Sequence, residues 1–332
     1  MNNILKVSSI ILGSIVGAGF ISGQEIYIFF NKTGSYGIVG LIIAIGIIGY
    51  IINKACVIIY QKQIGNYKEF IAETINVKNK IIKESINKIV TGFMLVSYFV
   101  MCTALNTYFY QEWNIPIFII GSINCILNLY ILNGKNGAVI KINELLMPII
   151  FVAISFLGLK EVDAIQLPTI RSEDKIIQPI INGIIYASYN LILLIPILTS
   201  LRKFLENGEK IKIISIISTL IIASIAIIVY LIIDSCLGAS NVEMPIIYIA
   251  NTLGNSYHYL YGIVVIIAIF TTAISVGYGF LQNVRKKSIG SIALITISSI
   301  FISYIGFSNL ISFLYPICGI LGLIQIIFII KY

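Results

Sequence analysis

Long apolar runs alternate with short polar segments along the whole chain. At about 20 apolar residues per crossing of a bilayer, this pattern predicts an all-α integral membrane protein with ten transmembrane helices. They are expected at residues 6–30, 36–60, 87–110, 115–132, 138–159, 177–201, 211–235, 257–283, 288–305 and 308–331. The polar segment 61–86 and the segment 242–253 are predicted as helices that lie at the membrane surface. A single transmembrane domain, 1–332, results.

The amino-acid composition excludes several classes of protein. Of the 332 residues, 58% are hydrophobic and 11% are charged, whereas a soluble domain carries roughly 25% charged residues. This excludes a soluble enzyme, a nucleic-acid-binding protein and a secreted disulfide scaffold. The five cysteines are unclustered inside apolar runs, as expected of small core residues. His258 has no metal-type ligand near it in the sequence and is expected to be structural or interfacial.

Enzyme chemistry and ATP-driven transport are not expected. The sequence contains no G-x-x-x-x-G-K-[ST] loop, no G-x-S-x-G and no H-E-x-x-H. We therefore expect no catalytic residue and no cofactor, with the lipid bilayer and a small-molecule solute as partners.

The basic residues predict the orientation. With the N-terminus inside, 18 of the 22 lysines and arginines fall on inner segments. The other four, which have acidic neighbours, are Lys32, Lys160, Arg171 and Lys175. By the positive-inside rule both termini are cytoplasmic, which fits a multi-pass protein of a bacterial inner membrane. Spans one to five (6–160) and six to ten (177–331) then have opposite topology, as in the inverted repeats of transporters.

The first span carries the most informative motif, G-S-I-V-G-A-G-F-I-S-G-Q-E from Gly13 to Glu25. Its four glycines each weaken a helix by about 1 kcal/mol relative to alanine. An unwound segment would expose carbonyls that suit a cation and a helix N-terminus that suits an anion. The alternative is close helix packing, because Gly13 and Gly17 form a G-x-x-x-G pair.

Span six favours the unwound segment. Ser188, Tyr189 and Asn190 interrupt its apolar run, and Pro196 follows. The interruption lies as far into the second half of the chain as the glycines lie into the first. Paired interruptions at matching positions indicate the binding site of a transporter, so we expect spans one and six both to be discontinuous. The alternative is a polar face on a packed helix.

Span eight offers a possible cation site. Thr271 and Thr272 place two adjacent hydroxyls in mid-span. Such hydroxyls usually bond back to the carbonyl four residues earlier. If they meet the carbonyls of a broken first span, they complete an oxygen cage that suits a hard cation such as sodium.

Three acidic residues lie within or at the edge of the predicted spans. Asp234 is at the outer end of span seven and is expected to be hydrated. Glu144 has Lys141 three residues earlier, which predicts an ion pair. Glu25 lies about 9 Å beyond the glycines at 1.5 Å per residue and has no basic partner in its helix. We assign it to an outer gate or a proton-titrating site.

The segment from Gly13 to Glu25 resembles the first helix of the bacterial YkvI-like membrane proteins. That family belongs to the amino acid–polyamine–organocation (APC) superfamily, which has the LeuT fold. The resemblance implies ten helices with helices 1 and 6 broken. It also implies a central solute site formed by Gly17, Ala18, Gly19, Phe20, Tyr98, Ser188, Tyr189 and Asn190. A sodium site is implied at Gly13, Val16, Ala268, Thr271 and Thr272.

The leading hypothesis is therefore a secondary active transporter that carries a small amino-acid-like or organic solute with sodium by alternating access. Proton-coupled members of the superfamily often carry a lysine on span five, and Met147 to Ile150 offer none, which favours sodium. One alternative is a solute-sensing receptor subunit of the spore-germinant type, which resembles these carriers in fold. The other is a proton-coupled carrier that uses Glu25.

Overall fold

The computed structural model describes residues 3–75, 80–133, 137–161, 176–236, 238–239, 242–283 and 288–332. Every regular element in these ranges is a helix. Six helices contain stretches long and apolar enough to cross a bilayer. They are α4 (Gly37–Gln61), α6 (Lys80–Trp113), α9 (Ile177–Ser200), α10 (Gly208–Ser235), α12 (Asn255–Asn283) and α14 (Phe307–Lys331). The chain is a multi-pass membrane protein, as its hydropathy pattern predicts.

The other four predicted spans also fold as helices, although their described apolar stretches are shorter. They hold α1 (Asn3–Ile15), α2 (Ala18–Ile21), α3 (Gln24–Phe29), α7 (Ile117–Asn133), α8 (Gly137–Lys160) and α13 (Ile289–Ile302). Short elements connect the long helices. They are η1 (Asn31–Thr33), α5 (Tyr67–Ile75), η2 (Arg202–Phe204), α11 (Pro245–Thr252) and η4 (Ser303–Ile305). Of the two predicted surface segments, 242–253 is present as the helix α11.

The predicted surface helix over residues 61–86 is wrong in its extent. A turn with Gln63 at φ 55° separates the end of α4 from α5. Asn66 then accepts a hydrogen bond from the Glu69 amide at 3.0 Å, and this cap starts α5. From Lys80 onward the chain already belongs to α6, because that helix continues without interruption into the third span.

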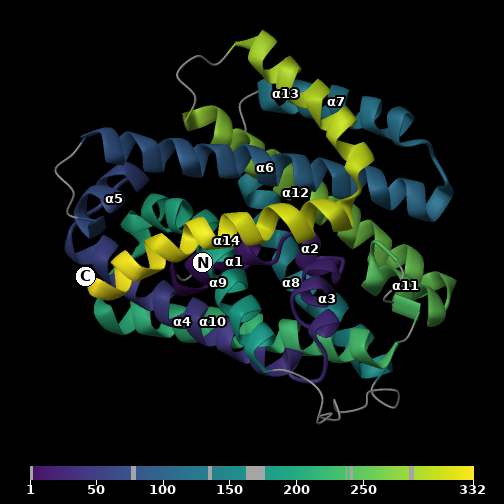
Figure 1. The fold of residues 1–332 in the computed structure, drawn as a ribbon, viewed down its shortest axis with the longest axis horizontal. Coiled ribbons are helices and arrows are strands. Elements are labelled where there is room, and N and C mark those ends of the chain that lie inside the picture. The colour runs from purple at the N-terminus through teal and green to yellow at the C-terminus, as the bar shows by residue number, and fades with distance from the viewer. Residues whose placement is uncertain are drawn as a thin grey trace.

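Helix α9 lies in the middle of the bundle between α4 and α14, and α1, α2 and α3 run through the centre of Figure 1. Glycines allow the close approach on both sides of α9. A Cβ built on Gly183 would lie 3.1 Å from the carbonyl carbon of Gly40 on α4. A Cβ built on Gly322 of α14 would lie 2.7 Å from the carbonyl carbon of Ser188.

The prediction that span six is discontinuous is wrong. Helix α9 continues through residues 188–190 and past Pro196. The Ser188 hydroxyl donates to the Ile184 carbonyl at 2.7 Å, and the Asn190 amide donates to the Tyr186 carbonyl at 3.0 Å. Polar side chains that return to the helix's own backbone satisfy themselves without unwinding it. The matching interruptions expected in the two halves are therefore not found.

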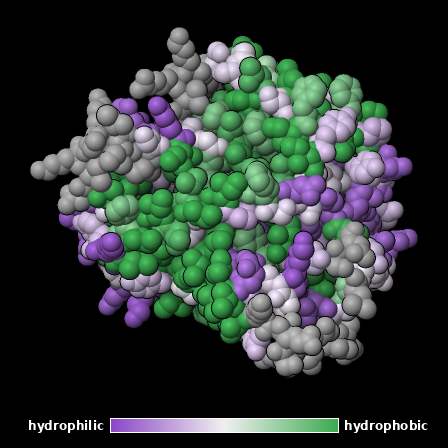
Figure 2. All heavy atoms as spheres, viewed as in Figure 1, coloured by the Kyte–Doolittle hydropathy of each residue, from purple (hydrophilic) through white to green (hydrophobic). Residues whose placement is uncertain are grey.

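The outer surface is apolar, whereas polar side chains are buried between helices. Leu159, Phe313 and Leu294 are 71%, 69% and 67% exposed. Figure 2 shows apolar residues across the middle of one face, with hydrophilic residues gathered toward its margins. A soluble monomer rarely exposes so much contiguous apolar surface, so these side chains face lipid.

Candidate functional site

The first span is interrupted twice, and the first interruption follows Ile15. Helix α1 ends there, and α2 begins at Ala18 after the extended residue Gly17 (φ −85°, ψ −171°). The Gly17 amide donates to the Ile15 carbonyl at 2.9 Å, which is a tight turn and not a helical step. The interruption of span one predicted from its glycines is thus present at Gly17, while Ala18 and Gly19 lie in the single turn of α2.

This first break leaves backbone groups unpaired. The carbonyls of Gly13 and Val16 and the amide of Phe20 have no hydrogen-bond partner among the described residues. Val16 and Phe20 are fully buried. Backbone polar groups at membrane depth are tolerated only where protein, water or a ligand can satisfy them. The first break therefore leaves both hydrogen-bond donors and acceptors without a partner among the described residues.

At the second break, at Ser22 and Gly23, the backbone carbonyls are satisfied by the protein itself. Gly23 has a φ of +82°, which turns the chain from α2 into α3. The Ile21 carbonyl accepts a hydrogen bond from the Tyr261 hydroxyl of α12 at 2.6 Å, and the Ser22 carbonyl accepts one from the Ile246 amide of α11 at 3.0 Å. Of the two breaks, only the first thus leaves carbonyl groups without a partner among the described residues.

Helix α12 brings one of the predicted sodium ligands, Thr272, next to the first break. A Cβ built on Gly17 would lie 3.9 Å from Thr272 Cγ2. The hydroxyls of Thr271 and Thr272 both donate to the Ala268 carbonyl, at 3.1 and 2.7 Å. Each hydroxyl oxygen keeps lone pairs with which it could bind a cation. The hydroxyls thus bond back to their own helix, as such hydroxyls usually do. These bonds use the hydroxyl protons and leave lone pairs on the oxygens.

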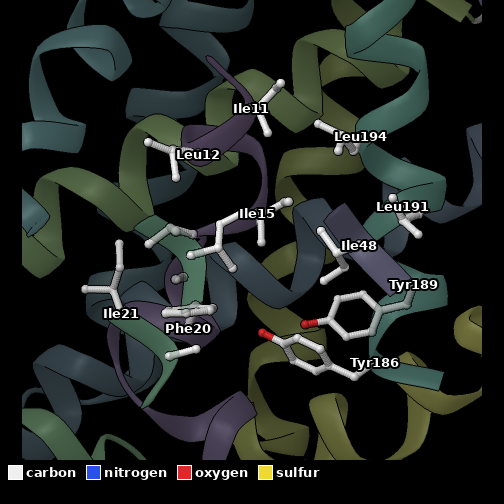
Figure 3. Close-up of a cluster of buried hydrophobic side chains, with 14 of the residues drawn as sticks. Ile11, Leu12, Ile15, Phe20, Ile21, Ile48, Tyr186, Tyr189, Leu191 and Leu194 are labelled. Atoms are coloured by element: carbon white, nitrogen blue, oxygen red, sulfur yellow. The ribbon is translucent and has the colours of Figure 1, made fainter. Parts of the chain in front are cut away.

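Helix α9 places two tyrosines on the side that faces span one, and we call Tyr186, Tyr189 and the rings packed against them the aromatic wall. Tyr186 and Tyr189 are three residues apart and share one helix face, and Figure 3 shows their hydroxyls pointing toward the side of the cluster that holds Phe20. The ring centroid of Phe29 on α3 lies 5.3 Å from that of Tyr186 and 5.8 Å from that of Tyr189. Tyr315 of α14 stacks against Tyr189 at 4.5 Å.

Glu25 lies against this wall. It is 3% exposed and accepts a hydrogen bond from the Tyr189 hydroxyl. Its side chain folds back over α2, because a Cβ built on Gly19 would lie 2.6 Å from Glu25 Cδ. Of the interruption predicted at Ser188–Asn190, only the Tyr189 side chain hydrogen-bonds to span one.

The third span approaches the first break with a residue that sequence reasoning missed. A Cβ built on Gly17 would lie 3.9 Å from Met101 Cε. Tyr98, one turn earlier on α6, packs its ring against Gly277 of α12. Its role as a solute contact stays a prediction. Helical spacing alone could have suggested Met101, because residues i and i+3 share a face.

The remaining charged candidates lie away from the break. His258 Nε2 lies 2.8 Å from Glu112 Oε2, and this contact joins the start of α12 to the end of α6. Asp234 is exposed and accepts a hydrogen bond from Asn31 at 3.4 Å. The side chains of Glu144 and Lys141 lie outside the described residues. Across the described ranges, no three His, Cys, Asp or Glu residues are grouped as metal ligands.

Comparisons with known proteins agree with a membrane protein. The chain is 23% identical over 327 residues to the uncharacterized membrane protein YkvI of Bacillus subtilis (strain 168), covering 96% of this chain and 92% of YkvI. It is 25% identical over 341 residues to the uncharacterized protein YyaD of the same organism, covering 99% of this chain and 96% of YyaD. No family model matches the chain. The similarity to YkvI over nearly the whole length agrees with the resemblance of the first span.

Proposed function

We propose that this membrane protein is a secondary transporter that binds a small solute at the first break of span one. One observation carries the proposal: the Gly13 and Val16 carbonyls and the Phe20 amide are unpaired in the interior of a helical membrane protein. A break in a helix does not require unpaired carbonyls, because the carbonyls at the second break of the same span all accept hydrogen bonds from the protein. Alternating access would expose this site to each side of the membrane in turn.

An amino-acid-like solute fits the donors and acceptors at the break. The unpaired Phe20 amide can donate a hydrogen bond to a carboxylate. Gly17 has no side chain to keep a solute from the backbone, and Ala18 has only a methyl group. Gly19 is covered by Glu25, so in this proposal the solute reaches Gly19 and the Tyr189 ring only after Glu25 has moved. In this proposal Ser188, Asn190 and Tyr98 form the outer part of the solute site.

Sodium is the proposed coupling ion. The Gly13 and Val16 carbonyls would bind it from span one, and the Thr271 and Thr272 hydroxyl oxygens would bind it from α12. The Ala268 carbonyl, which accepts both hydroxyl protons, would orient these two oxygens. Support comes from the position of Thr272 beside Gly17. An ion held between the two helices would pin span one to α12 and stabilise the state that accepts solute.

Helix pairing supports an inverted repeat of residues 6–160 and 177–331. Helices at equivalent places in the two halves pack against each other: α4 with α10, α6 with α12 and α7 with α13. Spans one and six are also neighbours, since α1 contacts α9. The continuous α9 departs from the repeat, so in this proposal only span one supplies backbone groups to the solute.

The test is transport by the purified protein in proteoliposomes. A panel of amino acids, amines and small carboxylates is applied with and without a sodium gradient while solute-evoked current is recorded on a solid-supported membrane. We expect current from an amino-acid-like solute only with sodium. In Thr272→Ala, the sodium concentration for half-maximal current should rise by about tenfold, which is within the usual range of coupling between two sites.

Thr296→Ala is the matched control. The Thr296 hydroxyl is also buried and also bonds back to its own helix, at 3.0 Å from the Ile292 carbonyl, but it lies on α13, away from the break. Its sodium dependence should equal that of the wild type. Equal currents without sodium would overturn the ion assignment. Solute binding in detergent without any current would overturn transport in favour of a receptor.

A further inference from the structure

Glu25 occupies an unusual place for an acidic side chain. It begins the first turn of α3, lies inside the bundle at 3% exposure, and covers Gly19 of α2. The absence of a side chain at Gly19 makes this position possible. The carboxyl group therefore lies between the segment that forms the first break and the aromatic wall of α9.

No cation faces this carboxyl group from the described elements that pack against α3. Helix α9 presents Tyr186 and Tyr189, and α14 presents Tyr315. On α10, the Tyr230 ring lies against Gly37, and Asp234 accepts a hydrogen bond from Asn31. The neighbouring lysine, Lys32 of η1, is exposed. Glu243 accepts a hydrogen bond from the Ser308 amide at the start of α14.

These surroundings suit the neutral form of Glu25. An ionised carboxylate is costly to bury unless a cation or several hydrogen bonds compensate it. Glu25 has one such bond, from Tyr189. The Tyr186 hydroxyl is buried without a hydrogen-bond partner in the described structure. It therefore donates no second hydrogen bond that would stabilise an ionised Glu25. A protonated acid needs neither a cation nor a second donor.

We propose that Glu25 is a proton-binding site that holds the segment α2–α3 against α9. With its proton, the carboxyl group packs between Gly19 and Tyr189. After the proton leaves to water, the charged group must become hydrated, which separates α3 from α9 about the turns at Gly17 and Gly23. Opening of the first break is therefore linked to pH. This proposal rests on the proposed function in one respect only: it describes the segment that opens as part of a solute site.

Hydrogen–deuterium exchange tests the proposal without any solute or ion gradient. Purified protein is labelled in detergent from pH 6 to pH 9, and rates are corrected for the intrinsic pH dependence of exchange. Opening linked to the loss of one proton changes by up to about tenfold per pH unit. We expect amides of residues 18–29 to lose protection as pH rises in the wild type and to stay protected in Glu25→Gln, which mimics the neutral acid.

Two further variants keep the test sharp. Glu243→Gln removes the neighbouring acid and should retain the wild-type pH dependence. Tyr189→Phe removes the hydrogen bond to Glu25 and should increase exchange of residues 18–29 at low pH. The proposal is overturned if Glu25→Gln shows the wild-type pH dependence, or if Glu243→Gln abolishes it. A lack of solute current in proteoliposomes would overturn the transport function and leave the exchange result unaffected.

Discussion

Spans one and six were both expected to break, and only span one does. In span one, glycines precede and follow α2, and both ends of α2 leave the helical path. In span six, Ser188 and Asn190 bond back to carbonyls of α9, and the helix continues past Pro196. Both interruptions depart from an apolar pattern in the sequence, but the first consists of glycines and the second of polar side chains.

The difference teaches which kind of interruption unwinds a membrane helix. A glycine removes the side chain that would favour helix and lets another group occupy its place, as Glu25 does at Gly19. A serine or asparagine carries its own hydrogen-bonding group, which the helix backbone satisfies. Span six thus contributes the Tyr189 hydroxyl, which donates a hydrogen bond to Glu25, while its backbone stays helical.

The largest expected effect is on the packing between α9 and α14. Gly322→Ala would place a Cβ 2.7 Å from the Ser188 carbonyl carbon. Because backbone atoms cannot easily move, we expect a loss of about 2–3 kcal/mol in the free energy of unfolding, measured by titration with a denaturing detergent. Gly46→Ala is the control: no atom lies within 4 Å of its built Cβ, and helix propensity predicts a gain of up to about 1 kcal/mol. Equal effects of the two substitutions would show that the α9–α14 contact does not depend on this glycine.

A smaller effect is expected at the second break of span one. Gly23→Ala puts a side chain on a residue with φ +82°, which costs about 1–2 kcal/mol. The built Cβ would also lie 2.8 Å from Ile233 Cδ1, although this flexible end can move. Gly254→Ala is the reference, because Gly254 has φ +123° with open space around it. Gly23→Ala should be the more destabilising of the two in the same titration, and the reverse order would contradict crowding at the break.

The smallest effect is expected in span six. Ser188→Ala removes only a hydroxyl that bonds back to its own helix, so stability should change by less than about 0.5 kcal/mol. A large loss of stability would mean that the hydroxyl supports α9 in a way that the back-bond does not explain.

The candidate site could be predicted in part. Glycine spacing located the first break to within a residue, and Thr272 of α12 lies beside it. Met101, Tyr186 and Tyr315 were missed because their importance depends on which helix faces which. Tyr261 could not be recognised either, since only the fold brings its hydroxyl to the Ile21 carbonyl.

The sequence by itself determined that this protein crosses a membrane many times, because hydropathy acts on each segment independently of its neighbours. It also determined where one helix would be interrupted, because the conformational freedom of glycine is a local property. Tertiary structure alone decided which interruption is real, which broken backbone groups find partners, and that Glu25 enters the core without a cation. These outcomes depend on hydrogen bonds and close contacts between helices far apart in the chain, and no local pattern encodes them.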